Sequence, residues 1–231
     1  MTGDDDPFFS AGSDDRTVIR PIPGGRVREP SHNASTMFPD DLQIGPLRHL
    51  GQLNPLENAG SVLLGLATCI YNQASHSDPQ GLRRQLAEEI RQFHTLASQA
   101  GVAPKTVGKA SYVLCTTLDE AVFNTPWGRQ GSWAEKSLLS EFHGSVAGGE
   151  GFFHELRDAG TQPEANLHLL ELMYLCLALG FQGRYQLEEN GAERLEQIQA
   201  WLAKLIHQQR REANTELSPH WKGVRVEYVS N

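Results

Sequence analysis

The chain has 231 residues and a mass of 25.6 kDa, which suits one or two domains and is long enough to bury a core. Hydrophobic residues make up 39% and charged residues 21%, the balance of a folded soluble protein rather than of a wholly disordered one. The formal net charge of −8 argues against nucleic acid as the main ligand and against a basic membrane-surface protein, because both need clustered Lys and Arg.

The cysteines, the N-terminus and the most apolar run indicate in which compartment the protein folds and whether it spans a membrane. Cys69, Cys115 and Cys176 lie far apart in apolar stretches without a CxxC motif, which predicts three buried thiols in a reducing compartment. The N-terminus, MTGDDDPFFS, has no basic start or apolar run, so we expect no export signal. The run LLELMYLCLALGF (169–181) is shorter than the roughly 20 residues of a membrane span and contains Glu171. We therefore expect no span within these residues.

Residues 1–50 differ in composition from the rest of the chain. They are rich in glycine and proline, carry mixed charges and show little apolar periodicity. Such a composition does not offset the entropy of ordering a chain. The sequence therefore predicts a flexible arm over residues 1–50.

Three helices are predicted between Asn54 and Pro126. Asn54-Pro55-Leu56-Glu57 supplies an N-cap side chain, a proline at the first helical position and an acid in the first turn. Asp78-Pro79 begins a second helix, whose apolar residues recur every three or four positions until Gly101. Pro104 begins a third, which we expect to end before Pro126.

Four more helices are predicted after residue 130. A capping box at 132–135 (SWAE) favours a fourth helix that carries Leu138 and Leu139. Gly148 and Gly149 are expected to break the pattern before a short fifth helix. A sixth is expected to run from Pro163 to a stop at Gly180, and a seventh from about Gly191.

The pattern as a whole predicts an all-α fold of about seven helices. Strict alternation occurs only at 224–229, which is too short to form a sheet alone. We expect the helical domain to span residues 51–222, followed by a tail at 223–231.

Metal and phosphate sites find little support in the sequence. The nine histidines include no HExxH motif. Glu150 with His154 is a single i, i+4 pair, and surface or helix-terminus histidines are far commoner than metal ligands. The run Gly148-Gly149-Glu150-Gly151 lacks the lysine of a phosphate-binding loop. We expect no metal and no cofactor.

Two adjacent acids, Asp119 and Glu120, interrupt the apolar run at 114–123. Neighbours on a helix point about 100° apart, so at least one of them faces solvent or a groove. For the same reason they do not converge on one substrate atom as a catalytic pair. They are either structural, as a cap or in an ion pair, or part of an acidic docking surface for a partner.

Trp127 and Trp133 follow in a predicted loop, which strengthens the docking hypothesis. A loop tryptophan is either a plug that fills the core or an aromatic anchor for a partner. We expect at least one of the two to be a core plug. The candidate docking residues are therefore Asp119, Glu120, Trp127 and Trp133.

Several motifs in this order and spacing resemble the TssL/DotU (IcmH) family of type VI and type IVB secretion systems. They are LCTTLDEAVFNTPWG (114–128), Trp133, LLSEFHG (138–144), GGEGFF (148–153) and LLELMYLCLALGFQGRY (169–185). DRTVIRPIPGGR (15–26) and LSPHW (217–221) are also similar to type VI members. The resemblance extends from about residue 54 to residue 221.

The resemblance implies a cytoplasmic domain of two small helical bundles, held at the bacterial inner membrane by one C-terminal transmembrane helix. It implies a structural subunit rather than an enzyme. Its partners would be TssM and TssJ in the membrane complex and TssK in the baseplate. Since the sequence ends with VRVEYVSN at Asn231, we expect residues 223–231 to stop before the anchor.

Alternatives remain open at this point. One is an enzyme of unknown class that uses Asp119, Glu120 or His143, and another is a freely soluble adaptor. The resemblance also allows phosphorylation of Thr17 in the arm, read by a forkhead-associated protein, against the simpler interpretation of an unmodified threonine. A homodimer is a further expected assembly.

Overall fold

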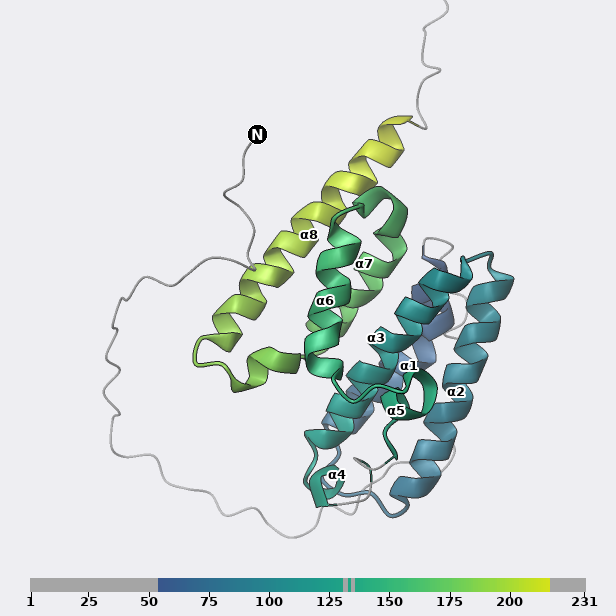
Figure 1. Cartoon of the computed structure of the whole chain (residues 1–231), viewed down its shortest axis with the longest axis vertical. Helices are drawn as coiled ribbons and strands as arrows, with labels where there is room; N and C mark the ends of the chain where they lie inside the picture. Colours follow the sequence, from purple (N-terminus) through teal and green to yellow (C-terminus); the bar gives the residue numbers. More distant parts are fainter. Residues whose placement is uncertain (1–53, 131–132, 134–135, 217–231) are drawn as a thin grey trace, which may run out of the picture. The chain divides into compact units, whose positions relative to one another are not determined.

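A computed structural model describes residues 54–130, 133 and 136–216 (Figure 1). These residues form eight α-helices, one 3₁₀-helix and no strand, which confirms the all-α prediction. The elements are α1 (Pro55–Tyr71), α2 (Pro79–Gln99), α3 (Pro104–Phe123), α4 (Pro126–Gln130), α5 (Leu138–His143), α6 (Gly148–Gly160), α7 (Pro163–Ala178), η3 (Gly183–Leu187) and α8 (Gly191–Glu216). The predicted arm at 1–50 and tail at 223–231 lie outside the described residues.

The sequence signals for most helix ends act as predicted. The side chain of Asn54 accepts hydrogen bonds from the amides of Leu56 and Glu57, at 2.9 and 3.3 Å. Asp78 accepts one from the amide of Gly81 at 2.8 Å. α7 ends just before Gly180, whose φ of +109° suits glycine.

Two predicted boundaries and one predicted loop are wrong. The cap of α5 is Ser137, whose hydroxyl accepts a hydrogen bond from the amide of Ser140 at 3.1 Å, and not the box at 132–135. Gly148 and Gly149 are the first two residues of α6 rather than a break before it. The loop expected around Trp127 contains the short helix α4.

α3 is the central helix of the described domain. It packs against α1, α2, α4 and α5 on one side and against α6 and α7 on the other, and most of its residues from Val107 to Val122 are buried. α7 in turn packs against α8, which also lies along η3. α3 thus joins the helix groups α1–α5 and α6–α8, which also meet where α1 packs against α7 (Figure 1).

The segment Pro163–Leu187 is apolar enough and long enough to meet the composition criteria for a membrane span. Its continuous α-helix is only 16 residues long, because the chain turns at Gly180. The face that includes Leu169, Leu172 and Cys176 is buried against neighbouring helices. In this fold the segment is a core helix.

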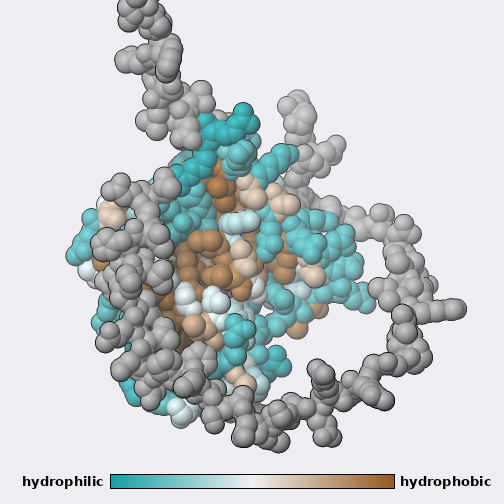
Figure 2. Space-filling model, turned by 180° about the vertical axis from the view of Figure 1, so that it is seen from behind, coloured by the Kyte–Doolittle hydropathy of each residue, from teal (hydrophilic) through white to brown (hydrophobic). Residues whose placement is uncertain are grey.

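Apolar side chains are also visible on the face opposite to that of Figure 1, where they gather in the middle and polar residues surround them (Figure 2).

The cysteine prediction needs one correction. Cys115 and Cys176 are buried free thiols, but the free thiol of Cys69 is exposed on α1. It lies on the outer side of α1, where Gly65, one turn before it, and Thr68 are exposed as well.

Candidate functional site

Asp119 is a buried acceptor that holds the segment leading into α5. Its Oδ1 accepts hydrogen bonds from the indole Nε1 of Trp133 at 2.8 Å and from the amide of Leu138 at 3.0 Å. Its Oδ2 accepts one from the amide of Leu139 at 2.8 Å. Asp119 thus binds buried amides at the start of α5 that have no partner within the helix, where the helix dipole favours a carboxylate.

Glu120 holds a different segment, the turn that follows α7, in the same way. Its two carboxylate oxygens accept hydrogen bonds from the amides of Gln182 and Gly183, both at 2.7 Å. The phenol of Tyr71 lies beside it, and burial together with the Glu120 charge raises the pKa of that phenol. Glu120 therefore fixes the turn between α7 and α8 to the central helix.

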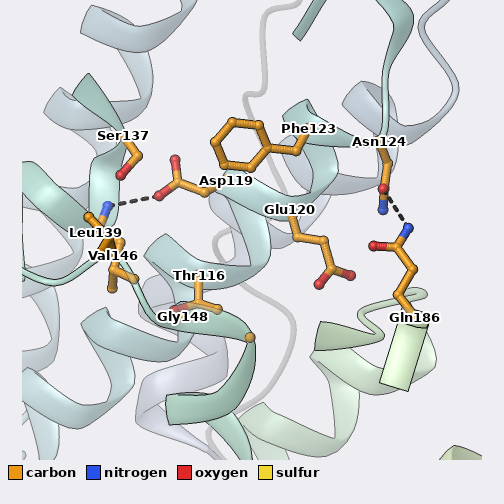
Figure 3. Close-up of a pocket in the computed structure, with 11 residues that line it drawn as sticks. Thr116, Asp119, Glu120, Phe123, Asn124, Ser137, Leu139, Val146, Gly148 and Gln186 are labelled. Carbon is orange, nitrogen blue, oxygen red and sulfur yellow. Dashed lines mark hydrogen bonds between the residues drawn. The ribbon is translucent and has the colours of Figure 1, made fainter. Parts of the chain in front are cut away.

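The adjacent acids point apart, as the helix geometry requires, and each binds a segment distant in sequence (Figure 3). Burial raises the pKa of Asp119, and hydrogen bonds from Leu139, Trp133 and Leu138 oppose that rise. Burial also raises the pKa of Glu120, opposed by the amides of Gln182 and Gly183. Because Asp119 is only 5% exposed, the acids do not form a pair of surface charges.

An open groove of about 230 Å³ lies between these two held segments (Figure 3). The described residues that line it are Thr116, Asp119, Glu120, Phe123, Asn124, Ser137, Leu139, Val146, Gly148, Gly149 and Gln186. They come from α3, from the start of α5 and α6, and from η3. We expected at least one of the two acids to face solvent or a groove, and both line this groove.

Two apolar side chains on the segments that form the groove are strongly exposed. Val146 lines it and is 87% exposed, and Leu187, which is 91% exposed, follows the lining residue Gln186. Sequence reasoning missed both, because neither stands in a helical or alternating pattern. Only the fold shows that Val146 and η3, which contains Leu187, belong to one groove.

Gly183 explains why the two glycine-containing motifs meet here. Its φ is +54°, and a Cβ at this position would lie 2.6 Å from the carbonyl oxygen of Gly149. Only glycine permits both the left-handed backbone and this approach. The start of α6 therefore packs directly on the turn that Glu120 holds.

The two tryptophans have different environments. Trp133 is 2% exposed and bound to Asp119, so it is a core plug. Trp127 lies on α4, is half-buried and donates its indole N–H to the carbonyl of Gln73 at 3.2 Å. A Cβ on Gly128 would overlap the carbonyl of Val122, which explains the glycine after Trp127. Trp127 does not line the groove.

The residues of the enzyme alternative do not share a site. Nε2 of His143 lies 3.1 Å from the hydroxyl of Ser111, which is fully buried. Ser111 precedes Asp119 by eight residues on α3, about 12 Å along the axis. Within the described ranges, no group of three or more His, Cys, Asp and Glu residues is arranged to hold a metal ion. Thr17 lies outside those ranges.

Comparisons with known proteins agree on one family. Residues 55–229 match the family described as type VI secretion system protein DotU. A crystal structure of TssL from Vibrio cholerae is 33% identical, with a TM-score of 0.62 over 68% of this chain and 97% of that one. The cytoplasmic domain of TssL from Acinetobacter baumannii is 27% identical, with a TM-score of 0.63 over 68% and 99%.

A third structure, SciP/TssL of the type VI system of enteroaggregative Escherichia coli 042, is 20% identical and supports the fold alone. Its TM-score is 0.54 over 77% of this chain and 95% of that one. Among curated proteins no relative matches. The family match covers most of the chain and includes every motif around the groove, and the chain therefore belongs to the DotU family of type VI secretion system proteins.

Proposed function

We propose that this chain is a structural subunit of the type VI secretion membrane complex, and that its helical domain docks the baseplate and other subunits of that complex. TssK and TssM are the proposed direct partners, within an assembly that includes TssJ. The observation that carries the proposal is the groove between α5, α6 and η3. Residues from separate family motifs meet there, the exposed Val146 lines it, and the exposed Leu187 follows its lining residue Gln186.

The groove has the features of an interaction surface. Exposed apolar side chains that gather at one place on a soluble protein mark binding sites, whereas single ones are ordinary. Val146 follows α5, whose start is bound by Asp119, and Leu187 lies in η3, which begins at the Gly183 bound by Glu120. Asp119 and Glu120 thus serve docking as positioning residues, and Trp133 supports Asp119 from the core.

Trp127 belongs to the proposal as a second, separate contact. Its ring is half-buried on α4, with the ring of His76 at 5.3 Å. A partly exposed tryptophan on a short helix offers a large apolar contact to a partner. It lies outside the groove, so its contribution is separable by substitution.

The proposal includes a location at the cytoplasmic face of the inner membrane. Residues 51–222 would form the docking domain, with the arm at 1–50 before it and the tail at 223–231 leading toward a membrane helix outside this chain. Family membership supports this arrangement. In the same way, we propose Thr17 as a regulatory phosphorylation site for a forkhead-associated reader, tested by comparing the binding of phosphorylated and unmodified peptides.

The docking proposal is tested by polar substitution at the exposed rim. Val146→Ser combined with Leu187→Ser removes both apolar contacts without touching the core, so the melting temperature should stay unchanged while affinity for purified TssK or the cytoplasmic part of TssM falls. Cys69→Ser, at an exposed position that does not line the groove, is the matched control. Wild-type affinity of the double variant for both partners would contradict docking at this groove.

A further inference from the structure

The charge of the groove points to the chemistry of its occupant. Two carboxylates line it, and none of its described lining residues is Lys or Arg. We infer that the groove receives an arginine or lysine side chain from the docking partner. The inference rests on the proposed function, since it names the group that the partner presents there.

The donors that bind the two carboxylates are all neutral. Asp119 receives backbone amides and an indole N–H, and Glu120 receives two amides and faces a phenol. A carboxylate oxygen can accept two hydrogen bonds, and Oδ2 of Asp119 and each oxygen of Glu120 accept only one from an amide, so room for a further donor remains. A buried negative charge without a cation costs free energy that an incoming cation would recover.

Three other partly buried acids of the described chain do have a cation. Glu141 binds Arg83 and Arg91, Glu155 binds Lys109, and Glu171 binds Arg210. Asp119 and Glu120 are consecutive residues of one helix, and neither forms an ion pair with a described Lys or Arg. The groove is thus the place where the fold leaves two negative charges for a partner to neutralise.

An unused hydroxyl lies in the same groove. Thr116 is 3% exposed, lines the groove one turn before Glu120, and its Oγ1 has no hydrogen-bond partner among the described residues. Figure 3 shows it beside Gly148, where a Cβ would approach its Cγ2 to 2.8 Å. A buried hydroxyl without a partner is unfavourable. It offers an acceptor to a guanidinium or ammonium N–H.

The size and the apolar part of the groove also suit one long cationic side chain. Its volume of about 230 Å³ is below the roughly 300–1,000 Å³ of sites for small-molecule ligands. Phe123, Leu139 and Val146 can contact the methylene stem of Arg or Lys while the charged end reaches the carboxylates. Arginine fits better than lysine, because its planar group donates in several directions at once.

A matched pair of substitutions at Val146 tests the inference with TssK and the cytoplasmic part of TssM as probes. Val146→Lys and Val146→Glu both remove the apolar contact at a highly exposed position, but they add opposite charges. Relative to Val146→Gln, the lysine variant should lose about tenfold in affinity at low salt, and the glutamate variant should keep or gain affinity. The difference should shrink at high salt.

The outcomes separate the inference from the proposed function. If the Lys and Glu variants lose affinity equally against wild type, the groove docks a partner but receives no cation, and the inference fails alone. If both variants bind like wild type, the groove is not used and both statements fail. Unchanged melting temperatures show that neither result comes from unfolding.

A direct measurement uses small probes with the full chain. Titration with n-propylguanidinium, monitored by NMR, should shift the amide signals of Leu139 and Gly183 and the indole signal of Trp133, since these groups bind the carboxylates. The neutral isostere n-propylurea is the control and should leave them unchanged. Equal shifts with both compounds, or shifts of equal size at exposed acids such as Glu196, would overturn the inference.

Discussion

At the scale of single residues, the adjacent acids of α3 show how far sequence reasoning reaches. Their 100° separation predicts that Asp119 and Glu120 do not converge, and the structure confirms this. Their ligands were not predictable, because the amides of Leu139 and Gly183 lie 20 and 63 residues further along the chain. A helical pattern shows which face a residue occupies and says nothing of the distant segment that covers it.

Removing the Asp119 carboxylate should destabilise the domain strongly. Asp119→Ala leaves the Trp133 indole and two amides buried without an acceptor, so we expect a loss of about 3 kcal/mol in the free energy of unfolding. Urea unfolding measures it. Glu88→Ala, which removes an exposed acid of α2, is the control and should cost less than about 0.5 kcal/mol. An equal loss of unfolding free energy in both variants would show that the Asp119 hydrogen bonds do not stabilise the fold.

The two acids also change the expected result of reversing both charges. An exposed pair would leave the melting temperature unaltered on substitution by lysine. Here Asp119→Lys with Glu120→Lys places two cations against bound backbone amides, which are themselves donors. We expect loss of the folded state, detected as a missing cooperative transition by circular dichroism. A cooperative transition near the wild-type midpoint would contradict the burial of these side chains.

At the scale of elements, local signals located most helices. Proline and cap residues gave the starts of α1, α2, α3 and α7, because these signals act within one turn. The sequence did not predict α4 as a helix, nor Ser137 as the cap of α5. The start of α5 depends on Asp119, so its determinant lies outside the local sequence.

Gly183 should be required for the packing of η3 against α6. Gly183→Ala adds a side chain at φ +54° and brings its Cβ to 2.6 Å from the Gly149 carbonyl, so we expect a loss of about 2–3 kcal/mol. Gly101→Ala is a matched control, with φ +82° and no atom within 4 Å of the added Cβ. It should cost about 1 kcal/mol from backbone strain alone. Chemical denaturation of both variants gives the difference.

Glu171, a buried acid of α7, links this helix to α1 and α8. Glu171 on α7 accepts hydrogen bonds from Arg210 on α8 at 2.6 and 2.8 Å, and from the side chain of Asn54 at the start of α1 at 2.8 Å. These bonds, with His168 close by, outweigh burial and lower the pKa of Glu171. The pair thus couples the ends of α1 and α8 through α7.

Glu171→Gln should lower stability in a pH-dependent way. Because the folded-state pKa of Glu171 lies below its usual value of about 4.3, its contribution is complete above that pH and disappears as the pH falls through the lowered pKa. At pH 7 we expect a loss of about 2 kcal/mol, less than for a fully buried pair, since Arg210 is 35% exposed. Urea unfolding of both proteins from pH 7 to pH 3 should show the difference shrinking, and a constant difference would contradict it.

At the scale of the whole molecule, the histidines provide a separate response to pH. His94 of α2 and His143 of α5 have lowered pKa values, in both cases mainly because burial disfavours the charged ring. Nε2 of His94 has no hydrogen-bond partner among the described residues. The charge of the His94 ring is the second cause that lowers the pKa of His143, so the two rings disfavour each other's protonation. The contact between α2 and α5 should therefore weaken when these rings are protonated.

The domain should lose stability between about pH 7 and pH 5 for this reason. A histidine whose folded-state pKa lies below the unfolded value of about 6.5 contributes fully above that pH, and its contribution falls by up to about 1.4 kcal/mol per pH unit below it. Asp119 and Glu120 have the opposite sign, because their raised pKa values favour the folded state as the pH falls. Comparing wild type with His94→Gln/His143→Gln cancels that carboxylate effect. The free energy of unfolding of the variant should depend less on pH than that of wild type. Parallel curves for the two proteins would exclude the histidines as the source of the loss of stability.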